Sequence, residues 1–441
     1  MKVTRTSRAL LSGLLAILVG YPFVKHAIVD PWIVRYEGDF TIYYRAAERL
    51  SKGESPYPLL ELARADGSEA SPIWGEYPYP PLLARVLAPF TYLNVLEAKY
   101  AYIGVCLTAF FVLMIRLLRK IVSSRLERWL AAAVLLGWGP FIYTIRLGQS
   151  ELLAIPFLAG AWLLLLESPH AGGSQRGHGF EFAAGLCLGT AAMVRVTPVL
   201  MLPALLVAGR WLLAGGFVTG SLATLVVSGP LTSWEFFTKV MPTMSDVGEM
   251  RHCPSFHVLI LRTIDALSPG VGNGSWLQNH ASDIAVAGSG VFYVGVLLFL
   301  FLRRHSLRTD RLVLLGCYLA PLFAGKNPHH YTLALFPVLG ASLMFVRTAL
   351  NGSSGCGWKR WRRLVVWCIA LIPSFYYWFP LKIAVDCFAR CTSLSSSTLF
   401  IMGNVVAFLM INRDSHLLFL TRNGTCPEKR RRSQDSHGNN R

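Results

Sequence analysis

Charged residues are scarce in this sequence. Asp, Glu, Lys and Arg make up 15% of its 441 residues, whereas soluble domains carry about a quarter. Hydrophobic residues account for 53%, the mean hydropathy is +0.45, and the apolar residues come in long blocks. Because lipid offers no hydrogen-bond partners to an open backbone, apolar blocks of roughly 20 residues cross a bilayer as helices. The composition therefore excludes an ordinary soluble domain and predicts an all-α polytopic membrane protein.

Several recognition motifs are missing as well. There is no glycine-rich phosphate loop, no Walker pattern and no convincing Ser-His-Asp order, and the nine cysteines lack metal-ligand spacing. The net charge is +18, but Lys and Arg lie in short clusters between the apolar blocks. That pattern argues against nucleic acid as a partner and is typical of positive-inside topology. No clear internal repeat is present, which disfavours a transporter built from inverted repeats.

The basic clusters and apolar blocks together predict a topology. The first span covers about residues 9–29, and its basic start places the N-terminus in the cytoplasm. Two large outside loops, 30–97 and 230–283, are expected to cover an active site. Both ends lie inside, with about twelve spans in a single transmembrane domain of residues 1–420. A basic cytoplasmic tail, residues 421–441, is predicted to be disordered.

Three segments need separate interpretation. Residues 82–90 are too few to cross a bilayer and are expected to pack at the interface or re-enter, as juxtamembrane structure in the first outside loop. Residues 129–145 are predicted to form one span, and the glycine-rich segment with Arg176 and His178 a polar cytoplasmic turn. Residues 183–207 contain Pro198, which breaks a helix, so we expect two short spans that meet near Arg195 on the outer side. If this block is one span, the later basic clusters fall on the wrong side.

This topology gathers the candidate functional residues on the outer face. The candidates are Asp39, Tyr43, Tyr79, Gln149, Arg195, His257, Lys326, His329 and His330. Asp39 follows the first span and precedes a helical pattern with Tyr43, Ala47 and Leu50 on one face. Two roles are open for it: a helix N-cap, or a general base at the membrane boundary.

The cationic candidates suit an anionic substrate. A buried Arg195 is expensive in a membrane segment unless it snorkels to the interface or meets an anion, and a lipid-linked phosphate would suit its guanidinium. Lys326 is expected to assist as a point charge. His329 and His330 are adjacent and would point to different faces of a helix, so at most one is expected to face the phosphate or a sugar hydroxyl. The alternative is that neither histidine has a functional role.

Four polar or aromatic residues are candidates for binding a sugar or the acceptor: Tyr43, Tyr79, Gln149 and His257. Gln149 could equally cap the helix that follows it, Tyr79 could serve as an interfacial aromatic, and His257 could be a loop residue without a role. A cytoplasmic nucleotide-sugar site has no candidate residues. An enzyme working outside has no nucleotide supply, so a transferase on that face must use a lipid-carried donor.

The sequence resembles glycosyltransferase family 87, a group of GT-C membrane enzymes. The resemblance extends over about residues 8–345 and rests on residues 39–47 with Gly53, Pro56 and Tyr57, then Tyr79-Pro80-Pro81-Leu82, Gly148-Gln149, Arg195-Val196-Thr197-Pro198 and Pro328-His329-His330-Tyr331. The chain departs from the family at two places. It has Arg195 where Lys is frequent, and Ser150-Glu151 where Asn and an apolar residue are more usual.

The resemblance implies a GT-C-type fold in a bacterial plasma membrane. It also implies a polyprenyl-phosphate donor of mannose or arabinose, a glycolipid or glycan acceptor, contact with membrane lipid, and Asp39 as the catalytic base. The leading hypothesis is an inverting glycosyltransferase, with mannose as the favoured sugar. No cofactor is expected with certainty, and a divalent metal bridging phosphate and carboxylate is an open alternative. The rival functions are a flippase or transporter of lipid-linked sugars, a phosphoglycan transferase of related architecture, and a structural membrane subunit.

Overall fold

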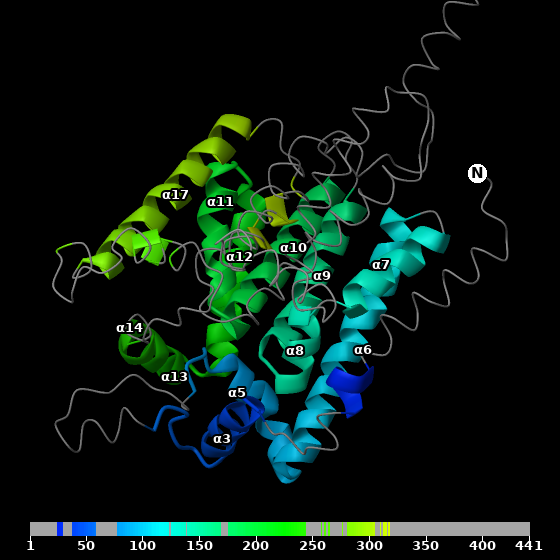
Figure 1. Cartoon of the computed structure of the whole chain (residues 1–441), viewed down its shortest axis with the longest axis vertical. Helices are drawn as coiled ribbons and strands as arrows, with labels where there is room; N and C mark the ends of the chain where they lie inside the picture. The colour runs from blue at the N-terminus through cyan, green and yellow to red at the C-terminus, as the bar shows by residue number, and fades with distance from the viewer. Residues whose placement is uncertain are drawn as a thin grey trace, which may run out of the picture.

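The computed structural model describes most of the first 243 residues and one later helix. The described ranges are residues 24–29, 38–58, 77–122, 125–137, 139–168, 175–243 and 280–304, with single positions between 257 and 317. Within them every regular element is helical, which confirms the all-α prediction (Figure 1). Three described helices are long and apolar enough to cross a membrane: α6 (Val95–Ile121), α12 (Trp211–Ser228) and α17 (Ala281–Arg303). The count of about twelve spans includes segments outside the described ranges and stays a prediction, as does the tail.

The first described stretch after the π-helix η1 (Val24–Val29) is the amphipathic helix α3 (Phe40–Ser51). Its buried residues include Tyr43, Ala47 and Leu50, as the helical pattern predicts. This face packs on α5 (Leu82–Leu87) and the 3-10 helix η2 (Ala88–Tyr92), near the lower end of the molecule in Figure 1. The two elements together are too short to cross a bilayer, in agreement with the expectation for this segment.

The long helix α6 begins at a capping box. The Asn94 side chain accepts a hydrogen bond from Glu97 N at 3.0 Å, and Glu97 Oε2 accepts one from Asn94 N at 3.3 Å. Two of the amide groups that a helix start leaves without partners are thereby satisfied. With 27 residues, α6 is about 40 Å long, and it packs against α9 (Glu151–Glu167).

Helical structure covers both parts of the expected span over 129–145, in α7 (Arg125–Gly137) and α8 (Gly139–Leu147). Residue 138 between them lies outside the described residues, so the single span stays a prediction. One prediction about an element boundary is wrong. The expected polar turn around His178 is instead the beginning of α10 (Gln175–Val194). Polar residues and glycine are tolerated there because packing further along holds the helix.

The interruption near Arg195 is confirmed. Helix α10 ends at Val194, and the chain continues through the 3-10 helix η3 (Thr197–Leu200) into α11 (Met201–Val207). Pro198 explains the break, because it has no N–H to continue the α-helical ladder and disfavours helical geometry at the residue before it. The second of the two expected short spans is not shown: η3 and α11 have four and seven residues, too few together to cross a bilayer, whereas α10 has 20.

Glycines bring α10 and α12 into backbone contact at the centre of the bundle (Figure 1). A Cβ atom at Gly189 would lie 2.0 Å from the Phe217 carbonyl oxygen, and one at Gly216 would lie 2.2 Å from the Phe182 carbonyl oxygen. Small residues at such a contact let membrane helices approach closely. The C-terminal end of α12 leads through Gly229 into α13 (Pro230–Glu235), the π-helix η4 (Phe236–Val240) and α14 (Met241–Thr243).

Candidate active site

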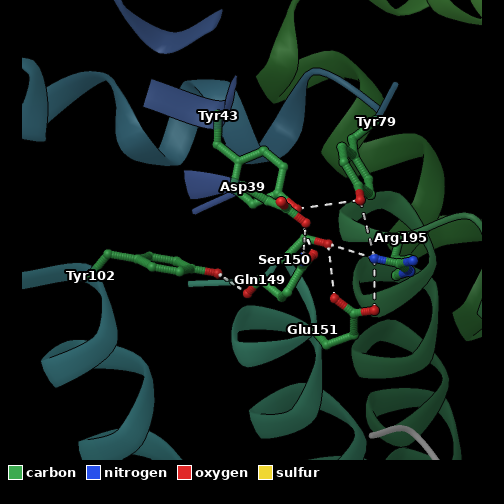
Figure 2. Close-up of polar contacts among 8 residues, drawn as sticks. All are labelled: Asp39, Tyr43, Tyr79, Tyr102, Gln149, Ser150, Glu151 and Arg195. Carbon is green, nitrogen blue, oxygen red and sulfur yellow. Dashed lines mark hydrogen bonds and ion pairs between the residues drawn. The ribbon is translucent and has the colours of Figure 1, made fainter. Parts of the chain in front are cut away.

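The carboxylate of Asp39 is not used by the helix that it precedes. Asp39 occupies the N-cap position of α3, but its backbone is in the helical region and its side chain makes no capping hydrogen bond. The first turn is closed by backbone groups, with Ile42 N donating to Asp39 O at 3.1 Å. The N-cap role is therefore wrong. The side chain is half-buried and points away from the helix toward a cluster of polar residues (Figure 2).

Gln149 is the direct partner of Asp39. Its Nε2 donates to Asp39 Oδ2, and its Oε1 accepts a hydrogen bond from the Tyr43 hydroxyl at 2.7 Å. Gln149 is 1% exposed and lies in the turn between α8 and α9. The preceding Gly148 has φ +68°, and a Cβ there would lie 3.0 Å from the Cβ of Phe40. Glycine thus permits both the turn and its close approach to the start of α3.

The second half of the cluster surrounds Arg195. Its Nη1 lies 2.7 Å from Glu151 Oε1, and the two side chains are 6% and 0% exposed. The same nitrogen donates to Ser150 Oγ at 3.1 Å and to the Tyr79 hydroxyl at 3.3 Å. The pair with Glu151 is a close charge contact rather than an aligned hydrogen bond, because no N–H is directed at Oε1. Glu151 Oε2 accepts a separate hydrogen bond from Ser150 Oγ at 3.3 Å.

Two tyrosines connect the halves of the cluster. The hydroxyl oxygens of Tyr43 and Tyr79 lie 3.3 Å apart, and their rings meet edge to face with centroids 5.1 Å apart. The guanidinium carbon of Arg195 lies 5.3 Å from the centroid of the Tyr79 ring, a cation–π distance. Side chains from four separate segments therefore form one continuous polar cluster (Figure 2).

Burial and nearby cations act in opposite directions on Asp39. Burial is the largest influence and raises the pKa of Asp39 above its usual value, while the hydrogen bond from Gln149 and the charges of Arg195 and Lys99 lower it. Lys99 lies on α6, is fully buried, and donates from Nζ to the Arg146 carbonyl oxygen at 2.7 Å. A carboxylate whose pKa is raised by burial holds a proton more readily than an exposed one, which suits a general base.

Five of the nine candidate residues come together in this cluster: Asp39, Tyr43, Tyr79, Gln149 and Arg195. His257 is half-buried and is not among the residues whose contacts Figure 2 draws. The remaining three, Lys326, His329 and His330, lie outside the described residues. Where the structure describes the chain, no group of three or more His, Cys, Asp or Glu side chains is arranged to hold a metal ion.

Sequence reasoning missed Glu151 and Lys99 as members of the site. Both are ionisable residues at the beginning of apolar helices and both are 0% exposed. An ionisable residue at the edge of an apolar block requires a partner, and this argument, which singled out Arg195, applies equally to Glu151. Arg195 and Ser150-Glu151, the two places at which the resemblance led us to expect departures from the family pattern, are in contact through Arg195 and Glu151 at 2.7 Å.

Comparison with models of known protein families identifies the family of this chain. The model of glycosyltransferase family 87 matches residues 77–325, which is more than half of the sequence. The chain belongs to glycosyltransferase family 87. It is thus a glycosyltransferase of a membrane family, and the resemblance found in the sequence is confirmed. Searches of curated proteins and of solved structures find no match.

The match to family 87 includes most of the cluster. Tyr79, Gln149, Glu151 and Arg195 lie within the matched residues, and Asp39 precedes them. Asp39 joins the site through its hydrogen bond with Gln149. The family 87 model therefore covers the cationic side of the cluster and the turn that holds the carboxylate.

Proposed function

We propose that this family 87 enzyme is an inverting glycosyltransferase. It moves a sugar, mannose by preference, from a polyprenyl-phosphate donor to a glycolipid or glycan acceptor on the outer face of the membrane. The observation that supports this best is the joining of a carboxylate and a guanidinium in one buried cluster, in which the carboxylate is not used by its own helix. The two groups provide a base for the acceptor and a cation for the leaving phosphate.

In the proposed reaction Asp39 acts on the acceptor. Its Oδ2 accepts the hydrogen bond from Gln149, so Oδ1 is the atom that takes the proton of the acceptor hydroxyl. The oxygen of that hydroxyl attacks the anomeric carbon from the face opposite the phosphate. A new carbon–oxygen bond forms while the old one breaks, and its electron pair leaves with the phosphate. The configuration inverts and no covalent sugar–enzyme intermediate forms.

Arg195 is proposed to bind the donor phosphate. The side-chain hydrogen bonds and the ion pair of Arg195 with the described residues are all made by Nη1, and in Figure 2 the dashed lines meet at that one nitrogen. Nε and Nη2 form the other edge of the guanidinium, which has the geometry to bind two phosphate oxygens. Lys326 and one of His329 and His330, which lie outside the described residues, are proposed to assist. Tyr79 and His257 are proposed to contact the sugar or acceptor, with Tyr43 and Gln149 bordering the same place.

The charges balance during this reaction. The phosphodiester of the donor carries one negative charge, and the released phosphate monoester gains a second as the bond breaks. Asp39 loses its negative charge at the same step because it receives the acceptor proton. The net charge of the site is unchanged, so the low-dielectric cluster need not accommodate a new charge in the transition state.

A transfer assay tests the proposal. The purified enzyme in lipid vesicles is given radiolabelled polyprenyl-phosphate mannose or arabinose and a mixture of glycolipid acceptors, and the products are analysed for a new glycosidic bond. We expect transfer by the wild type and none by Asp39→Asn. Glu48→Gln, the same change on the exposed side of α3, is the matched control and should remain active. Full activity of Asp39→Asn would refute the mechanism, and sugar-lipid translocation without a new bond would favour a flippase.

A further inference from the structure

The side-chain amide of Gln149 is used at both ends. Oε1 faces the Tyr43 hydroxyl at 2.7 Å, and Nε2 faces Asp39 Oδ2. A carboxylate can only accept hydrogen bonds, so the amide must present its NH2 group to Asp39. The reversed amide would set its carbonyl oxygen against the carboxylate, with two acceptors in contact. The orientation of Gln149 is thus determined by its two partners.

A series of donors leads from Arg195 to this amide. Nη1 of Arg195 donates to the Tyr79 hydroxyl, which lies 3.3 Å from the Tyr43 hydroxyl. Each hydroxyl has one proton, and that of Tyr43 is given to Gln149 Oε1 in the shorter contact. The proton between the two tyrosines then comes from Tyr79. The donors all point the same way, from the cation toward Asp39, and such chains strengthen their members.

The backbone of Gln149 is fixed as well. Its N–H donates to the Thr144 carbonyl at 3.0 Å, and its carbonyl oxygen accepts from the Tyr102 hydroxyl at 3.1 Å. The turn that carries it packs through Gly148 on Phe40, the residue after Asp39. Both ends of the Gln149–Asp39 contact therefore belong to rigid, packed segments.

We propose that Gln149 is a positioning residue for Asp39: it holds Oδ2 so that Oδ1 faces the acceptor hydroxyl, and the Tyr79–Tyr43 hydroxyl chain fixes the orientation of its amide. This inference rests on the proposed function of Asp39 as the base. Gln149 touches the base, and its effect on the acceptor passes through the carboxylate. Its role differs from sugar binding, because the side chain is 1% exposed and each of its polar atoms already has a partner in the protein.

The amide also favours the ionised form of Asp39. A hydrogen bond donated to a carboxylate lowers its pKa, and here it opposes the effect of burial. The other charged or titratable groups around Asp39 are Arg195 after α10, Lys99 on α6, Glu151 on α9, and the two tyrosines. All of these remain when Gln149 alone is replaced. A change in the pH profile would then report the lost amide.

The experiment measures kcat against pH with polyprenyl-phosphate mannose for the wild type, Gln149→Leu and Tyr43→Phe. Losing a hydrogen bond to a charged group should lower kcat of Gln149→Leu by roughly 10- to 100-fold. The acidic limb of its pH profile should move to higher pH, because the amide no longer opposes the rise in the Asp39 pKa that burial causes. Tyr43→Phe should shift the limb less, in the same direction. Tyr44→Phe is the matched control, since that hydroxyl lies 2.7 Å from the carbonyl oxygen of Leu93 and 3.2 Å from that of Thr91, outside the cluster.

If the acidic limb of the Gln149→Leu profile does not shift, the proposal is overturned. This holds if kcat falls only in proportion to the yield of folded protein, as for a structural role. It also holds if KM for the donor or acceptor rises, as for a substrate-binding role. Asp39→Asn separates this failure from a failure of the proposed function. If Asp39→Asn is inactive and Gln149→Leu keeps the wild-type profile, only the positioning role is refuted. If Asp39→Asn is fully active, the base assignment is wrong and the positioning role falls with it.

Discussion

The buried pair of Glu151 and Arg195 allows a stability prediction with a definite size. Their side chains are 0% and 6% exposed, and the charges approach to 2.7 Å. Removing one partner of a buried ion pair costs about 3–5 kcal/mol, because the other charge remains buried without compensation. Replacing both partners with apolar side chains of similar volume is often neutral or stabilising. Glu151→Leu and Arg195→Met should each destabilise the protein, and the double variant should recover most of the loss.

The two single variants should not be equal. Without Arg195, the Glu151 carboxylate keeps its hydrogen bond from Ser150 and can take up a proton, which limits the penalty. Without Glu151, Arg195 cannot lose its charge, although Ser150 and Tyr79 still accept from Nη1. Arg195→Met should therefore lie near 3 kcal/mol and Glu151→Leu nearer 5 kcal/mol, both as approximate values.

Thermal unfolding in detergent, followed by tryptophan fluorescence, gives the order of stability, and a double-mutant cycle gives the coupling. The exposed pair of Glu48 and Lys52, at 3.0 Å, is the matched control, and its removal should change stability by no more than about 1 kcal/mol. Additive losses in the Glu151 and Arg195 variants would refute the reasoning about the pair. The double variant should fold without transferring sugar. If it transfers sugar at the wild-type rate, Arg195 does not bind the phosphate.

Three further predictions concern single residues. Gly189→Ala should lower the melting temperature, because its Cβ would meet the Phe217 carbonyl oxygen at 2.0 Å; Gly215→Ala on α12, with open space around it, is the control and should not. Asp39→Asn should leave the melting temperature at neutral pH unchanged or higher. A raised folded-state pKa means that Asp39 supports folding only at low pH and opposes it once the pH rises through that value, so a clear loss of stability would contradict the prediction. Glu151→Gln should lower KM for the donor and strengthen inhibition by polyprenyl phosphate, since it removes the negative charge that faces Arg195 and would repel a phosphate bound there. Unchanged donor KM and product inhibition would argue against phosphate binding beside Arg195.

Local rules predicted those parts of the fold whose cause is local. Pro198 interrupts its apolar block whatever surrounds it, and the apolar face of α3 follows from the spacing of Tyr43, Ala47 and Leu50. The composition and the family pattern were enough to predict a helical membrane glycosyltransferase.

The site was predictable in its members but not in their contacts. Asp39 follows a glycine and precedes a helix, so the local rule favoured an N-cap. The side chain instead meets Gln149, 110 residues further along the chain. No local pattern contains that information. Arg195 was expected either to snorkel to the interface or to meet an anion. Glu151 provides that anion, because a buried guanidinium in the protein without substrate needs a counter-charge.

Glu151 has a consequence for catalysis under the proposed mechanism. Among the described residues the cluster holds two acidic side chains, Asp39 and Glu151, and two basic ones, Arg195 and Lys99, so their formal charges cancel when all four are ionised. A guanidinium without Glu151 would attract the phosphate more strongly, and most of all the doubly charged product. Binding that favours the product over the transition state slows turnover. With Glu151 on Nη1, Arg195 is held in place while its attraction for the phosphate is reduced. The ion pair thus contributes both the position of the cation and the release of the lipid phosphate.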